Sequence, residues 1–90
     1  MATQIEAMRW MTYHAAWMKA EGKECFKNIC MAKLFCSETL NDIARKGMHI
    51  FGGRGYSMEY RMQRYLRESY LSLYAGGTSE IQKNVIARFL

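Results

Sequence analysis

Apolar residues recur every three or four positions along most of this 90-residue chain, which is the spacing of one face of an α-helix. The pattern predicts four helices, over residues 3–20, 24–51, 59–74 and 79–90. In the second helix the apolar stripe consists of Cys25, Ile29, Ala32, Cys36, Leu40, Ile43 or Ala44, Gly47 and Ile50. No proline interrupts the sequence, which favours a mostly helical domain with short connections.

Glycines mark the ends of the first two predicted helices. Gly22 follows the first helix, and the pair Gly52-Gly53 follows the second, as expected of glycine C-caps. The segment from Gly53 to Met58 is not a dinucleotide-binding fingerprint, because no strand precedes it and Met58 stands where the third glycine belongs.

The start of the last predicted helix has the chemistry of a ligand-binding turn. Gly76 and Gly77 allow a tight turn with positive φ and a close approach of the backbone. Ser79 followed three residues later by Gln82 is typical of a capping box, so we expect Ser79 to cap this helix. The first N–H groups of a helix favour an anionic or hydrogen-bond-accepting ligand.

Composition and charge exclude several classes of function. The 13 lysine and arginine residues outnumber the 8 acidic ones, but they are spread from Arg9 to Arg88 and predict a solvated surface. No nucleic-acid-binding motif is present, so no nucleic-acid partner is expected. The stretch from Met1 to Met18 lacks an apolar run long enough for a signal peptide or a membrane span, which predicts a cytoplasmic protein without a membrane partner.

The three cysteines, Cys25, Cys30 and Cys36, are spaced five and six positions apart and have no partner set with zinc-ligand spacing. No metal site is therefore expected. We interpret them as small, reduced residues that face the core.

Several segments match, in order, the motifs of one enzyme family. They are Arg9, Ala15-Ala16, Ala32-Lys33, His49-Ile-Phe-Gly-Gly-Arg-Gly-Tyr56, Arg67-Glu68, Gly76-Gly-Thr-Ser-Glu-Ile-Gln82 and Ala87-Arg88. Together they resemble the C-terminal helical domain of the FAD-dependent acyl-CoA dehydrogenases, with residues 1–90 as a single domain. The resemblance implies an all-α, up-down helical bundle, and specifically an incomplete four-helix bundle that is completed by oligomerisation or by missing segments.

The resemblance also implies roles for individual residues. Those implied to contact FAD are His49, Gly52, Gly53, Thr78 and Glu80. Tyr74 and Gly77 are implied to flank the thioester of an acyl-CoA substrate. His49 stands where the family usually has Gln, and Arg61 stands where it commonly has Pro, which is expected to lengthen or straighten the third helix.

The catalytic base is missing from this stretch of sequence. In many members of the family the base is the Glu directly before Gly-Thr, and this position is Gly76 here. The resemblance therefore implies either a base from an earlier helix or a chain that has lost the reaction.

Two functions follow from these features. The first is the C-terminal domain of an FAD-dependent acyl-CoA dehydrogenase-like flavoprotein of fatty acid metabolism, which supplies flavin contacts and subunit interfaces. The alternative is a catalytically inactive helical self-association or interaction module. Both predict a homo-oligomer, because an incomplete bundle leaves an apolar face exposed.

Overall fold

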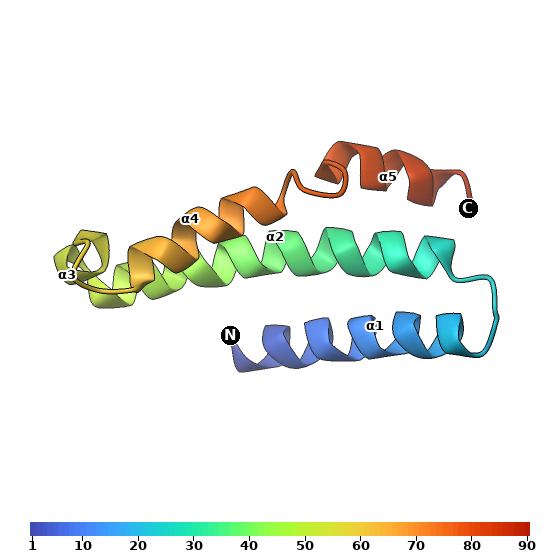
Figure 1. The fold of residues 1–90 in the computed structure, drawn as a ribbon, viewed down its shortest axis with the longest axis horizontal. Coiled ribbons are helices and arrows are strands. Elements are labelled where there is room, and N and C mark those ends of the chain that lie inside the picture. Colours follow the sequence, from blue (N-terminus) through green and yellow to red (C-terminus); the bar gives the residue numbers. More distant parts are fainter.

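Helix α2 is the axis of the molecule, and the other helices are arranged around it (Figure 1). The computed structural model describes residues 1–90 and contains helices only. Its elements are α1 (Ala2–Ala20), α2 (Phe26–Phe51), α3 (Gly53–Tyr56), α4 (Met62–Ser72) and α5 (Ser79–Ala87). The prediction of an all-α fold is confirmed.

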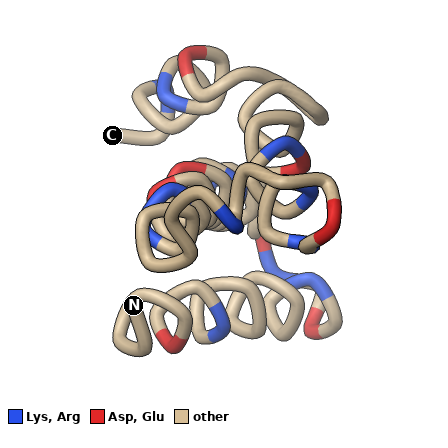
Figure 2. The backbone as a smooth tube through the Cα atoms, turned by 90° about the vertical axis from the view of Figure 1, so that its left-hand side faces the viewer, with Lys and Arg blue, Asp and Glu red and all other residues tan.

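The helices form three layers with α2 in the middle layer. Helix α1 runs antiparallel to α2 on one side, and α4 and α5 follow one another along the other side (Figure 1). The view along the long axis separates the same layers (Figure 2). Helix α1 contacts neither α4 nor α5, so the up-down arrangement is an open stack rather than a closed bundle.

Small and polar side chains form the interior. The buried apolar residues are Ala15, Cys30, Ala32 and Ala44, and the buried polar residues are Ser37, Thr39, Asn41, Ser69, Ser79 and Gln82. Small residues allow helices to approach closely on both sides of α2. Asn41 donates a hydrogen bond from Nδ2 to Oγ of the fully buried Ser69 at 3.0 Å, which gives each buried side chain a partner and joins α2 to α4.

Helices α1 and α2 are joined by polar contacts as well as by packing. Nε2 of Gln4 donates to Oδ2 of Asp42 at 3.2 Å, and Lys46 pairs with the same carboxylate oxygen at 2.8 Å. The hydrogen bond from Lys46, followed by that from Gln4, lowers the pKa of Asp42 from its ordinary value of 3.8.

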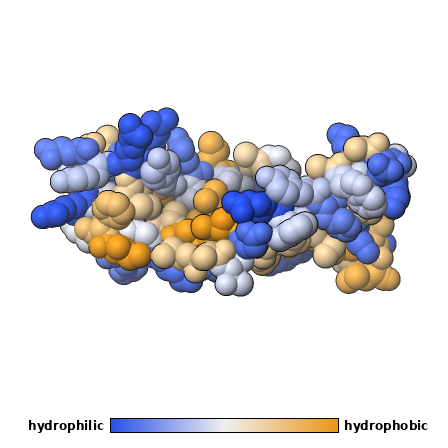
Figure 3. Space-filling model, turned by 90° about the horizontal axis from the view of Figure 1, so that it is seen from below, coloured by the Kyte–Doolittle hydropathy of each residue, from blue (hydrophilic) through white to orange (hydrophobic).

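Many large apolar side chains remain at the surface. Trp10 is 66% exposed and Ile50 is 70% exposed. Figure 3 views the molecule from the α1 side and shows apolar side chains on the surface among the hydrophilic ones. The exposed area is 6576 Å², against roughly 5400 Å² for a compact monomer of this mass. The chain is therefore less compact than a typical monomer, and large apolar side chains form part of its exposed surface.

The predicted apolar stripe of α2 is only partly correct. Ala32 and Ala44 are buried as expected, but Ile29, Leu40 and Ile50 are exposed. The reason is that α2 has neighbours on two sides, so its buried positions do not follow a single helical face. The three cysteines are free thiols, of which Cys30 is buried, whereas Cys25 and Cys36 are partly exposed.

The end of the first helix follows the sequence prediction closely. Gly22 has a φ of 72°. Its N–H donates to the Lys19 carbonyl at 3.1 Å, while the N–H of Lys23 donates to the Met18 carbonyl at 3.0 Å. This pair of bonds is the Schellman motif, which requires a left-handed residue at the position of Gly22.

The third predicted helix is wrong in its extent. It corresponds to α4, which begins at Met62 instead of residue 59 and ends at Ser72 instead of residue 74, while the short α3 lies in the segment predicted to connect the second and third helices. Arg61 therefore does not lengthen the helix. Ser57 has an extended backbone with a ψ of 142°, which ends α3 and starts a series of turns before α4. The last helix also ends early, at Ala87 instead of residue 90.

Candidate functional site

The connection between α4 and α5 contains the glycines that the sequence predicted to form a tight turn. Gly76 has a φ of 72° and Gly77 a φ of 106°, so both adopt backbone conformations that other residues rarely accept. The predicted positive φ at this turn is therefore confirmed. Tyr74, Gly76, Gly77, Thr78 and Glu80 lie together along this turn and the first residues of α5.

The cap of α5 is Thr78, so the prediction of Ser79 as the cap is wrong. Oγ1 of Thr78 accepts a hydrogen bond from the Ile81 N–H at 3.2 Å. Thr78 has the extended backbone of a capping residue, with a ψ of 165°, whereas Ser79 is already the first residue of the helix. With Thr78 as the cap, a capping box would need Glu or Gln three residues later, and this position is the apolar Ile81.

Gln82 makes a different bond from the one expected of a capping box. Its Nε2 donates to the carbonyl oxygen of Gly76 at 3.1 Å. The side chain therefore reaches back from the helix to the turn that precedes it.

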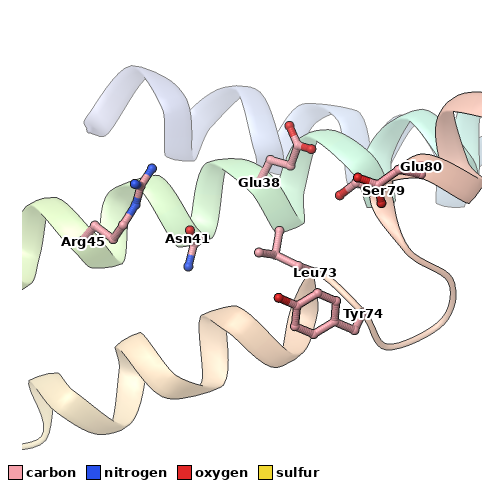
Figure 4. A pocket seen from close by; sticks show the side chains of 7 residues that line it. All are labelled: Glu38, Asn41, Arg45, Leu73, Tyr74, Ser79 and Glu80. Carbon is pink, nitrogen blue, oxygen red and sulfur yellow. The ribbon is translucent and has the colours of Figure 1, made fainter.

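A pocket of about 400 Å³ lies between α2, the end of α4 and the start of α5 (Figure 4). Its lining residues are Glu38, Asn41, Arg45, Leu73, Tyr74, Ser79 and Glu80. Figure 4 shows the three α2 side chains along one wall and Tyr74 on the facing wall. Of the residues predicted to act in function, the pocket contains Tyr74 and Glu80.

Sequence analysis missed the α2 wall of this pocket. Glu38, Asn41 and Arg45 are spaced three and four residues apart, which places them on one face of the helix. This polar face was the available signal. The apolar stripe of the same helix does not include these positions.

The charges of the pocket restrict what it can hold. Arg45 lies toward one end, and the carboxylates of Glu38 and Glu80 lie toward the other (Figure 4). Two carboxylates repel a bare phosphate, whereas a polar group with both donors and acceptors can bond to them. The chemistry of the lining therefore suits the polar edge of a heterocycle better than an isolated anion.

His49, Gly52 and Gly53 form a second group at the corner between α2 and α3. His49 is exposed in the last turn of α2, and Gly52 ends that helix with a φ of 63°. A Cβ atom placed on Gly53 would meet no atom within 4 Å, so the backbone is open to a close neighbour. Figure 1 places this corner at one end of the molecule, away from the α4–α5 turn, so a single chain does not bring the two groups together.

The structure contains neither a metal-binding cluster nor a membrane-spanning helix. No group of three or more histidine, cysteine or acidic side chains is placed to hold a metal ion. None of the helices combines the length and the apolar character needed to cross a lipid bilayer.

Comparison with known proteins gives a consistent result. The family model of the acyl-CoA dehydrogenase C-terminal domain matches residues 1–90. Benzylmalonyl-CoA dehydrogenase of Aromatoleum aromaticum is 43% identical over 88 residues, which cover 98% of this chain and 23% of that protein.

Solved structures agree with the family model. Butyryl-CoA dehydrogenase from Megasphaera elsdenii superimposes with a TM-score of 0.95 at 35% identity, over 98% of this chain and 23% of that one. The FAD complex of PigA superimposes with a TM-score of 0.93 at 32% identity, with the same coverage of 98% and 23%. The chain therefore spans about a quarter of the length of the proteins it matches.

Proposed function

The chain belongs to the acyl-CoA dehydrogenase family as its C-terminal domain, and we propose that it supplies flavin contacts and subunit interfaces to an FAD-dependent oxidoreductase of acyl-CoA thioesters. The observation that carries the proposal is the match to the family model from the first residue to the last. A cytoplasmic location and the absence of nucleic-acid and membrane partners stay predictions from the sequence.

The residues at the start of α5 suit the polar edge of FAD. The hydroxyl of Thr78 accepts the capping bond and still has its own proton to donate. The carboxylate of Glu80 is exposed and can accept a hydrogen bond from a ring N–H. The N–H groups of the first helical turn have no partner within the helix. When bound, FAD would supply a hydride acceptor at this site.

The corner at His49, Gly52 and Gly53 suits a second flavin contact. Its open backbone lets a planar or extended group approach closely, and the imidazole of His49 can donate or accept a hydrogen bond. Because this corner lies away from the α4–α5 turn, we assign it to the FAD of a neighbouring subunit. This assignment requires a homo-oligomer, which the exposed apolar surface also favours.

Tyr74 and Gly77 are assigned to the thioester of the acyl-CoA. Gly76, which occupies the position of the usual base, has no group that accepts a proton. We therefore expect the base to come from a helix outside these 90 residues, and we expect the 90-residue chain alone to show no turnover.

The alternative function, a helical self-association module without flavin, is favoured by the same glycine and by the apolar surface. It differs from the first proposal in one measurable property, the binding of FAD.

Gly53→Leu in the full-length protein tests the proposal. The new side chain meets open space and no positive φ, so the fold should be unchanged. We expect FAD affinity to fall more than tenfold, because the cofactor must approach this backbone closely. Glu21→Leu is the control, since it adds the same side chain to the exposed turn at the opposite end of α2.

Flavin fluorescence titration measures both variants beside the wild type. Unchanged affinity in Gly53→Leu would remove these glycines as cofactor contacts. A wild-type protein that binds no FAD would leave the self-association module as the function.

A further inference from the structure

Gln82 is buried in a way that is unusual for its residue type. Glutamine is mostly exposed in proteins, whereas Gln82 is only 7% exposed. Its one hydrogen bond within the chain is from Nε2 to the Gly76 carbonyl at 3.1 Å. The two bonded residues are six positions apart, so the bond joins the start of α5 to the middle of the α4–α5 connection.

The amide of Gln82 occupies the space that a side chain at position 77 would need. A Cβ atom at position 77 would lie 2.7 Å from Nε2 of Gln82, closer than non-bonded atoms tolerate. The φ of 106° at Gly77 independently disfavours any other residue. The absence of a side chain at position 77 is therefore a condition for the Gln82 bond.

The ends of the same connection are held by other side chains. Nζ of Lys33, on α2, donates to the Ser72 carbonyl at the end of α4 at 2.7 Å. Thr78 caps the start of α5. Between these two anchors, the only side chain that holds the backbone of the turn is Gln82.

We propose that Gln82 is a positioning residue that fixes the α4–α5 turn and so orients Thr78 and Glu80 toward the flavin. The side-chain amide holds the Gly76 carbonyl in a turn whose two glycines have many other conformations available. The proposal deepens the proposed function and rests on it for the identity of the ligand. The state of the turn itself does not depend on FAD.

The experiment compares three variants of the full-length protein. Gln82→Met keeps the length of the side chain and removes the amide. Gln82→Glu keeps the shape and replaces the donor with a carboxylate. Gln63→Met is the matched control, because Gln63 is a half-buried glutamine of α4 that lines a different pocket, beside Met48 and Leu66.

Two measurements are made on each variant. Hydrogen exchange of the Ile81 and Gln82 amides, which are bonded to Oγ1 and to the carbonyl oxygen of Thr78, reports in FAD-free protein whether the turn still holds Thr78 in place. Fluorescence titration reports FAD affinity. Gln82→Met should speed exchange at these amides and weaken FAD binding by about five- to tenfold, the effect of one net hydrogen bond. Gln63→Met should change neither.

Gln82→Glu adds a pH signature that loss of packing alone would not produce. The introduced carboxylate faces the Gly76 oxygen and repels it, but its protonated form can donate to that oxygen. Burial and the bond raise the pKa of this carboxyl above that of a free glutamate. FAD affinity and turn protection should therefore recover, relative to the wild type, as pH falls from about 8 to about 5.

Gly77→Ala provides a second route if Gln82→Met folds poorly, because the methyl group must displace the Gln82 amide. The double variant Gly77→Ala/Gln82→Met should lose less FAD binding free energy than the sum of the two single losses, since both substitutions remove the same bond.

Wild-type exchange rates at the amides of residues 81 and 82 in Gln82→Met would overturn the proposal, as would faster exchange with unchanged FAD affinity. If the wild-type protein binds no FAD, the proposed function fails and the orientation toward flavin falls with it. The exchange measurement would still show whether Gln82 holds the turn.

Discussion

Replacing Thr78 with alanine removes the only side-chain cap among the five helices. The lost bond joins Oγ1 of Thr78 to the Ile81 N–H at 3.2 Å, in a partly exposed position where water can replace it in part. We therefore expect a cost of about 1 kcal/mol, the middle of the range for such caps. This corresponds to about a fivefold increase in the opening of α5.

Hydrogen exchange of the α5 amides in FAD-free, full-length protein measures this opening directly. Helix α5 has nine residues, too few for stability on its own, so it should open locally when its cap is removed. Thr78→Ser retains the hydroxyl and is the control that should stay close to the wild type.

Ser79→Ala decides between the two candidate caps. The hydroxyl of Ser79 makes no hydrogen bond within the chain, so its removal should change the stability of α5 by less than about 0.5 kcal/mol. If Ser79→Ala opens α5 as much as Thr78→Ala does, the assignment of the cap to Thr78 is wrong.

Three other predictions concern the turn, the α1–α2 contact and assembly. Gly76→Ala should destabilise the domain by about 1 kcal/mol because of its φ of 72°, although a Cβ there meets no atom; chemical denaturation showing no loss would contradict this. Asp42→Asn should destabilise the packing of α1 at neutral pH. Since the pKa of Asp42 is lowered in the fold, the stability that its carboxylate contributes is fully present above pH 3.8 and is lost as pH falls through the lowered pKa. The exchange rates of the α1 amides in the variant and in the wild type should therefore converge in acid. The isolated 90-residue chain should self-associate in light scattering across a dilution series, and a folded monomer at high concentration would refute this.

The sequence determined those features that depend on one residue and its near neighbours. The ends of α1 and α2 were predictable because Gly22 and Gly52 follow the last apolar positions, and each adopts a positive φ that glycine accepts at little cost. The glycine turn before α5 followed from the same property of Gly76 and Gly77. The family motifs then indicated the residues of the two candidate contact groups.

The tertiary structure decided which of several locally equivalent choices is realised. Thr78 and Ser79 are both good caps, and only the backbone at Thr78 placed its hydroxyl against the Ile81 N–H. The exposed Leu40 and the buried Asn41 reversed the expectation for α2, because that helix packs on two sides and Asn41 finds a partner in Ser69. The bond from Gln82 to Gly76, like the pocket wall on α2, joins segments whose approach no local pattern specifies. Local conformational preference can be read along the chain, whereas burial and pairing depend on which surfaces meet in space.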